Sequence, residues 1–148
     1  MDPLYGQRTT HTKAPQDGGK WVIIDATDKI MGRLASRVAS ILLGKTKPQF
    51  MPGVVAGDRV IIINAANVKT TGDKVNQKLY HWHSGYFGGL KTRTMKKQME
   101  KVPDKILYEA IKGMLPKNTH GRKLLTRVRI FQGNAHGMDA QKPEMIQV

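Results

Sequence analysis

The 148-residue sequence contains no cysteine, and its apolar residues never form a long run. Without cysteine there is no disulfide bridge, no thiolate nucleophile and no cysteine-ligated zinc. No apolar stretch approaches the roughly 18 residues that a membrane-spanning helix requires, and the first twenty residues lack the apolar core of a secretory signal. The sequence therefore predicts a protein that has no disulfides and does not cross a membrane.

Acidic residues are scarce. The chain has 11 Asp and Glu against 25 Lys and Arg, which gives a formal net charge of +14. Residues 69–129 alone hold fifteen basic and four acidic residues, a net charge of +11. A compact surface with so much charge of one sign repels itself unless a polyanion binds to it. The charge therefore favours a nucleic acid as the partner, with an anionic membrane surface as the second candidate.

Signature motifs for nucleotide binding and for covalent catalysis are also missing. No G-x-G-x-x-G follows the first apolar run, and no G-x-x-x-x-G-K-[ST] occurs anywhere. Ser84 lies next to His83 but lacks the G-x-S-x-G context of a hydrolase nucleophile. The few carboxylates are scattered, and Asp25, at the end of an apolar run, is interpreted as a strand-end turn residue. The sequence therefore gives no support to nucleotide binding or to nucleophilic catalysis.

The apolar pattern predicts strands that alternate with helices. Short apolar runs predict strands over residues 21–25, 59–65, 79–83 and 127–131. Apolar residues spaced three and four apart predict a helix that Asp28 caps and Gly44 ends, and further helices that begin near Thr94, Pro103 and Asn118. Residues 84–93 are expected to form a glycine-rich loop. This alternation indicates an α/β domain with a mostly parallel sheet.

The stretch "YHWHSGYFGG" places His81 and His83 two residues apart. On a strand both side chains would point to the same face, so both would reach one metal ion. Zinc would still need a third or fourth ligand, and no carboxylate follows within sixteen residues of His83. We therefore predict no metal site and favour histidines that contact phosphates or bases.

Two basic clusters point to RNA. "KTRTMKK" (91–97) has four positive charges in seven residues, and "KNTHGRKLLTRVR" (117–129) has five and no acid. Neutralising phosphates would remove the repulsion within them. The glycines at 85, 88 and 89 let a backbone approach a ribose-phosphate chain, and the neighbouring aromatics offer π-faces. No helix-turn-helix, zinc-finger or RNP signature occurs, so the pattern favours recognition of structured RNA by its shape.

Four stretches, in order, resemble the signature segments of one family. They are "WVIIDATDKIMGRLASRVASILLGK", "GDRVIIINAANVKTTGDK", "KLYHWHSGYFGGLK" and "AIKGMLPKNTHGRKLLTRVRIFQG". The family is that of large ribosomal subunit protein 13, bacterial or organellar type. The resemblance runs from Trp21 to the C-terminus. Phe87 departs from it, because many members have proline there.

The resemblance implies a three-layer α/β/α fold with a four-stranded, mostly parallel sheet. It also implies a structural constituent of the large ribosomal subunit that binds 23S-type rRNA early in assembly and contacts neighbouring ribosomal proteins. It implies no enzyme activity, no cofactor, no small-molecule substrate and no homo-oligomer. The expected location is a cytoplasmic or organellar ribosome. The alternatives are a free-standing RNA-binding regulator and a metal-dependent RNA-processing enzyme built on His81 and His83.

We expect an extended arm over residues 1–20, a single α/β rRNA-binding domain over 21–133 and a tail over 134–148 that packs on or near the domain. The predicted rRNA contacts are basic residues in loops and on helix faces, with three polar residues that match the family motifs. They are Arg33, Lys45, Lys47, Lys74, His83, Ser84, Lys91, Arg93, Lys96, Lys97, Lys117, Asn118, Arg122, Lys123, Arg127 and Arg129.

Overall fold

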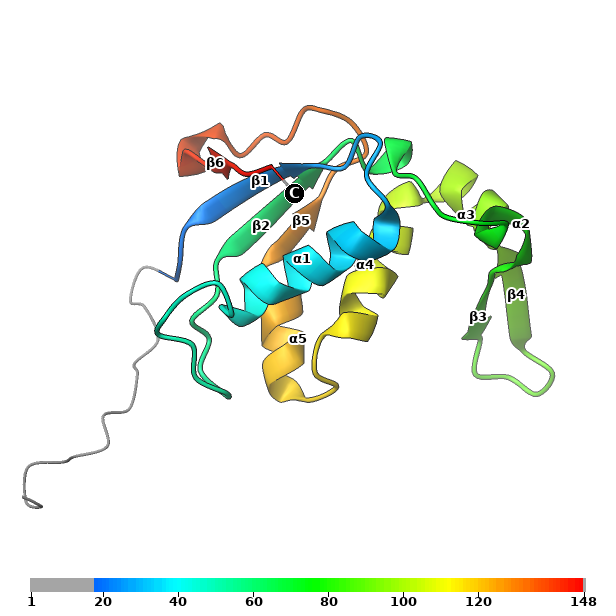
Figure 1. Ribbon diagram of the computed structural model, residues 1–148. Coiled ribbons are helices and arrows are strands. Elements are labelled where there is room, and N and C mark those ends of the chain that lie inside the picture. The colour runs from blue at the N-terminus through cyan, green and yellow to red at the C-terminus, as the bar shows by residue number, and fades with distance from the viewer. Residues whose placement is uncertain (1–17, 148) are drawn as a thin grey trace, which may run out of the picture.

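A four-stranded parallel sheet organises the chain (Figure 1). The computed structural model describes residues 18–147, so residues 1–17 of the predicted arm lie outside the described part. The strand order is β5-β2-β1-β6, and all three pairings are parallel. The strands are β1 (Trp21–Asp25), β2 (Arg59–Ile63), β5 (Val128–Ile130) and β6 (Glu144–Met145). The predicted α/β class with a four-stranded, mostly parallel sheet is therefore confirmed.

The pairing of β1 with β2 forms the centre of the core. Both strands are nearly unbroken apolar runs, which is typical of strands that are covered on both faces. Ile24 and Ile62 are fully buried and face the large cluster of helical side chains. Ile23 pairs with Ile61 and faces the opposite side of the sheet. A slip of one residue in this register would exchange the two faces and move Ile24 and Ile62 out of the large cluster.

Helices cover one face of the sheet. The principal helices on this face are α1 (Met31–Leu43), α4 (Pro103–Met114) and α5 (Thr119–Leu125). In Figure 1, α1 runs past the strands, with α4 and α5 next to it. The opposite face is covered more thinly, by Trp21, Phe131 and Met138. The short helix η3 (Asp139–Gln141) follows the last of these. The arrangement is consistent with the expected three layers.

One predicted strand belongs elsewhere. Residues 79–83 do form a strand, β3 (Leu79–His83), but it pairs antiparallel with β4 (Leu90–Thr94) in a separate hairpin. The sequence predicted a loop over 84–93, so β4 replaces the last part of that loop. Four of the five β3 residues are exposed, so the run lacks the two buried faces that the parallel sheet requires. The fourth strand of the sheet is instead β6, from the predicted tail. Two residues are too few for a periodic signal.

Helix ends follow the predictions with one exception. Gly44 ends α1 with a φ of 80°, Pro103 opens α4, and the Asn118 side chain accepts a hydrogen bond from the backbone of Gly121 at 2.8 Å. The predicted Asp28 cap is wrong, because the residue before α1 is Ile30, which makes no side-chain cap. The Met31 N–H instead donates to the carbonyl of Lys69 at 2.8 Å, so a neighbouring chain segment satisfies it.

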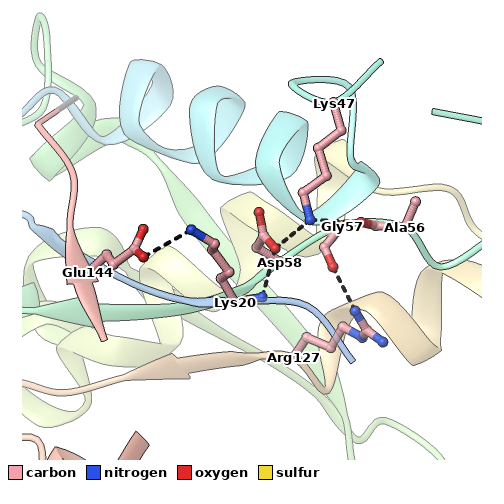
Figure 2. Close-up of polar contacts among 7 residues, drawn as sticks. All are labelled: Lys20, Lys47, Ala56, Gly57, Asp58, Arg127 and Glu144. Atoms are coloured by element: carbon pink, nitrogen blue, oxygen red, sulfur yellow. Dashed lines mark hydrogen bonds and ion pairs between the residues drawn. The ribbon is translucent and has the colours of Figure 1, made fainter. Parts of the chain in front are cut away.

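A buried carboxylate joins the starting ends of the strands (Figure 2). Asp58 Oδ1 accepts from the backbone N–H of Lys20 at 2.9 Å and from Lys47 Nζ at 2.6 Å. Lys47 Nζ also donates to the Ala56 carbonyl at 3.2 Å. From the other side, Arg127 Nη1 donates to the carbonyl of Gly57 at 2.8 Å. These bonds connect the residues just before β1, β2 and β5 to the loop that follows α1.

We expect Asp58→Ala to lower the free energy of unfolding by about 2–4 kcal/mol, because it leaves a half-buried ammonium and a backbone N–H without their acceptor. Glu144→Ala is the matched control. It removes the Lys20–Glu144 ion pair at 3.0 Å in the same network, but both side chains are more than half exposed. We expect a loss below about 1 kcal/mol there. Urea denaturation of both variants measures the difference, and equal losses would contradict the central role of Asp58.

Candidate nucleic-acid interface

The predicted contact residues fall into separate groups on the folded chain. The hairpin cluster consists of His83, Ser84, Lys91, Arg93, Lys96 and Lys97. The α1 cluster consists of Arg33 and Lys74. The α5 cluster consists of Lys117, Asn118, Arg122 and Lys123. Lys45, Lys47, Arg127 and Arg129 lie outside these groups.

Between residues 18 and 147, no helix is long and apolar enough to cross a membrane.

The β3–β4 hairpin stands beside the main sheet (Figure 1). Its base is fixed to the body: Met95 is fully buried, and its N–H donates to the Lys78 carbonyl at 2.9 Å. Tyr80 also packs against the main core, and burial raises the pKa of its phenol. The hairpin is therefore anchored at its base. β3 and β4 carry His83, Lys91 and Arg93 outward, while Lys96 and Lys97 lie on α3 (Met95–Lys101), which follows β4 directly.

Within the hairpin cluster, two side chains are already oriented by their neighbours. His83 Nδ1 accepts from the Gly85 N–H at 3.0 Å, so Nε2 is the nitrogen that is left for an external partner. The Arg93 guanidinium lies 4.9 Å from the centre of the Trp82 ring, and its Nη1 donates to Gln98 Oε1 at 3.0 Å. The lysines of the cluster are exposed, namely Lys91, Lys96 and Lys97. The cluster thus combines oriented donors with free ammonium groups.

The two neighbouring histidines are not grouped with a third possible metal ligand among residues 18–147. Among the described residues, no group of three or more His, Asp or Glu side chains is placed to hold an ion. His81 and His83 lie on the exposed hairpin, and no carboxylate comes near them in sequence. The hydrogen bond at His83 Nδ1 serves the turn instead.

Arg33 is shared by adjoining hollows on the surface of α1. One, of about 440 Å³, is lined by Arg33, Ser36, Arg37 and Ser40. A second, of about 310 Å³, brings Arg33 together with Lys74 from α2 (Lys74–Gln77), two residues far apart in the sequence. The predicted set omits Arg37, although its spacing of four residues from Arg33 was a signal that both face the same side. A hollow lined by two cations suits a phosphate group.

Three of the four residues of the α5 cluster, all except Lys123, line a smaller hollow of about 190 Å³. Lys117, Asn118 and Arg122 line it together with the apolar side chains of Leu115 and Pro116. The predicted set recognised the three polar residues and not the apolar ones. Gly121 belongs at this point for steric reasons, since an added Cβ would collide with the carbonyl oxygen of Pro116. The family motif around these residues therefore has a packing role besides its charge.

The predicted residues outside the clusters have different surroundings. Lys47 and Arg127 make the internal contacts shown in Figure 2. Arg129 Nη1 donates to the carbonyl of Thr126 at 3.2 Å, on the edge strand β5. Lys45 is exposed in the loop after α1. Charge alone placed Lys47 and Arg127 in the predicted set, and only the fold shows that both hold backbone carbonyls.

Asp25 closes the carboxyl ends of β1 and β2. Its Oδ1 accepts from the Thr27 N–H at 2.9 Å, from Thr27 Oγ1 at 2.7 Å and from Asn64 Nδ2 at 3.0 Å. These hydrogen bonds favour the charged carboxylate, the backbone bond most of all, and lower the pKa of Asp25 below its ordinary value of 3.8. The interpretation of Asp25 as a strand-end turn residue is therefore confirmed.

The molecule is a basic α/β protein. Its exposed cations lie beside surface hollows and along a projecting hairpin. A family model described as Ribosomal protein L13 matches residues 19–137. Large ribosomal subunit protein uL13 of Thermotoga petrophila is 48% identical over 142 residues, which cover 96% of this chain and 95% of the relative. The protein of the same name from Brevibacillus brevis is 51% identical over 142 residues, with 95% and 98% covered. The chain belongs to the ribosomal protein L13 family.

We expect Asp25→Asn to destabilise the fold in a pH-dependent way. Because the folded pKa is depressed, the carboxylate stabilises the fold fully above its unfolded pKa near 3.8. That stabilisation is lost as the pH falls through the lower, folded pKa. The difference in free energy of unfolding between wild type and Asp25→Asn should therefore be largest near pH 7 and shrink below about pH 3.8. Urea titrations between pH 7 and pH 2.5 measure it, and a difference that stays constant with pH would contradict this account.

Proposed function

We propose that this chain is a structural constituent of the large ribosomal subunit that binds its rRNA and has no enzymatic activity. The observation that carries the proposal is near full-length similarity to proteins named large ribosomal subunit protein uL13. The excess of basic residues agrees with it, since rRNA is the polyanion of that particle. The named relatives come from bacteria, which favours a cytoplasmic, bacterial-type ribosome.

The three clusters support a clamp between RNA segments. The hairpin, α1 and α5 clusters occupy different elements, so each would neutralise phosphates of a different part of the rRNA. Every cation that does so releases counterions. By analogy with DNA, six to ten such contacts would lose roughly 10³–10⁵ in affinity between 50 and 200 mM salt. Holding several segments together would support early assembly of the subunit beside neighbouring ribosomal proteins, as a single copy of the chain.

We also propose limits for the domain and for its two flanking segments. Residues 21–133 form the rRNA-binding domain, preceded by an arm over 1–20 and followed by a tail over 134–148. The pairing of β6 with β1 supports a tail that packs on the domain. Lys47 and Arg127 are the weakest members of the proposed contact set, because both already hold internal acceptors.

A sucrose gradient of cell lysate after a high-salt wash tests the function. We expect the protein to remain with the large subunit, because an integral component is held by many contacts at once. A free-standing RNA-binding regulator would leave the subunit and run at the top of the gradient. A short RNA other than rRNA, tightly bound to the protein in the top fractions, would then favour the regulator over a ribosomal constituent.

Replacing Lys96, Lys97, Arg122 and Lys123 together with Ala tests the contact residues. We expect weaker binding to large-subunit rRNA and a shallower dependence of log K on log salt, by about 0.7–0.9 for each lost contact. The matched control replaces Lys29, Lys101, Lys105 and Lys142, four exposed lysines outside the clusters, and removes the same net charge. Filter binding at several salt concentrations measures both. Unchanged affinity and slope in the first variant, or equal losses in both, would defeat the assignment.

A further inference from the structure

The tip of the β3–β4 hairpin carries the most exposed aromatic side chains of the described chain. Phe87 exposes 109% of its reference surface and Tyr86 exposes 80%. Leu90 is also exposed, at 63%, but it lies at the start of β4 and outside the turn that carries the two rings. Large apolar groups that stay exposed in their own fold mark binding surfaces when they gather in one place. We therefore expect the tip to bind a partner that has an apolar face.

The loop that carries these rings has a defined shape. The Ser84 N–H donates to the Gly89 carbonyl at 3.1 Å, and the Gly89 N–H donates to the Tyr86 carbonyl at 2.9 Å. Gly85 and Gly88 adopt φ values of 92° and 68°, which other residues rarely take. Two backbone hydrogen bonds thus close the turn that contains Phe87. A preformed turn reduces the entropy that is lost when the ring binds.

The charge around the tip decides which partner fits. No acidic residue occurs between Asp73 and Glu100, and the same stretch holds six lysines and arginines. Two of these cations already lie over hairpin aromatics: Lys78 Nζ is 5.2 Å from the Tyr80 ring centre, and Arg93 is 4.9 Å from that of Trp82. Exposed rings beside cations match an unpaired nucleotide, whose base offers a π-face and whose phosphate carries negative charge. An apolar protein pocket would not neutralise these cations.

We propose that Phe87 stacks on an unpaired nucleobase of the large-subunit rRNA, while the lysines of the hairpin cluster hold the neighbouring phosphates. The proposal rests on the proposed function and adds to it a base contact that depends on an aromatic ring. Tyr86 lies beside Phe87 and offers a second face. Stacking reads no particular base, so the contact would select an unpaired position and not a sequence.

Binding of the full-length protein to large-subunit rRNA transcript tests the stacking. We expect Phe87→Ala to weaken binding roughly 5- to 150-fold, the range that loss of one base–aromatic stack produces. Phe87→Trp should bind as the wild type does, because it keeps an aromatic ring, and Phe87→Leu should fall near Phe87→Ala. Leu90→Ala is the matched control in the same hairpin, with an expected change below about twofold. All four variants should unfold at the wild-type urea midpoint, since Phe87 and Leu90 are exposed.

Three outcomes would overturn the proposal. If Phe87→Leu binds the transcript as tightly as the wild type, the contact needs apolar surface and not an aromatic ring, and the stacking is wrong. If Phe87→Ala binds normally while the quadruple variant of the clusters does not, the basic interface stands and the stacking is wrong. If both bind normally, the contact surface of the proposed function fails as well.

Ultraviolet crosslinking gives an independent readout. Trypsin releases residues 79–91 as one peptide, because it cleaves after Lys78 and Lys91. After irradiation of the complex of wild-type protein and rRNA transcript, we expect this peptide to carry a nucleotide adduct at Phe87 or Tyr86. The adduct should lie at an rRNA position that is unpaired. An adduct at paired positions only, or none on this peptide, would contradict the stacking.

Discussion

The parallel pairing of β1 with β2 supports every other part of the molecule. The two strands bury apolar side chains on both faces, so helices must cover one side and the segment from Phe131 to Met138 the other. Parallel strands cannot be joined by a tight turn, which makes α1 the connection that closes the pair. A carboxylate then fixes each end of the pair, Asp58 where β2 starts and Asp25 where β1 finishes. Apolar packing thus stabilises the two faces of the strand pair, and hydrogen bonds to two carboxylates stabilise its two ends.

This use of carboxylates shapes the surface. Asp25 is surrounded by hydrogen-bond donors, Asp28 pairs with Lys69 at 2.8 Å and Asp58 pairs with Lys47. Of these three acids Asp58 is buried and Asp25 half-buried, while Asp28 stays exposed. The cations of the hairpin, α1 and α5 clusters make no such pair with them and face solvent or a polyanion. The basic surface therefore follows from the excess of 25 Lys and Arg over 11 Asp and Glu, two of which are used inside the fold.

The hairpin shows how the fold separates support from contact. Tyr80 and Met95 tie its base to the core, while its tip carries only exposed side chains. A rigid base with a closed turn can project groups into a partner without weakening the domain itself. In the α1 and α5 clusters, by contrast, Arg33, Lys117 and Arg122 border hollows beside helices that are packed against the sheet. Together the three clusters form a projection and recesses, the surface that we propose for rRNA.

The sequence by itself determined the elements whose signal is local. The apolar runs of β1 and β2, the helical stripe of α1, the Pro103 start of α4 and the Asn118 cap of α5 are each encoded within a few neighbouring residues. The same holds for the net charge and for the motifs of the family. Only the tertiary structure decided the partners of those elements. It joined β3 to β4 because the exposed β3 run cannot fill a sheet that is buried on both faces, and it recruited the two-residue β6 through pairing with β1. It likewise gave Lys47 and Arg127 internal carbonyl and carboxylate acceptors, which charge counting along the chain cannot detect, because those acceptors lie 9 to 70 residues away.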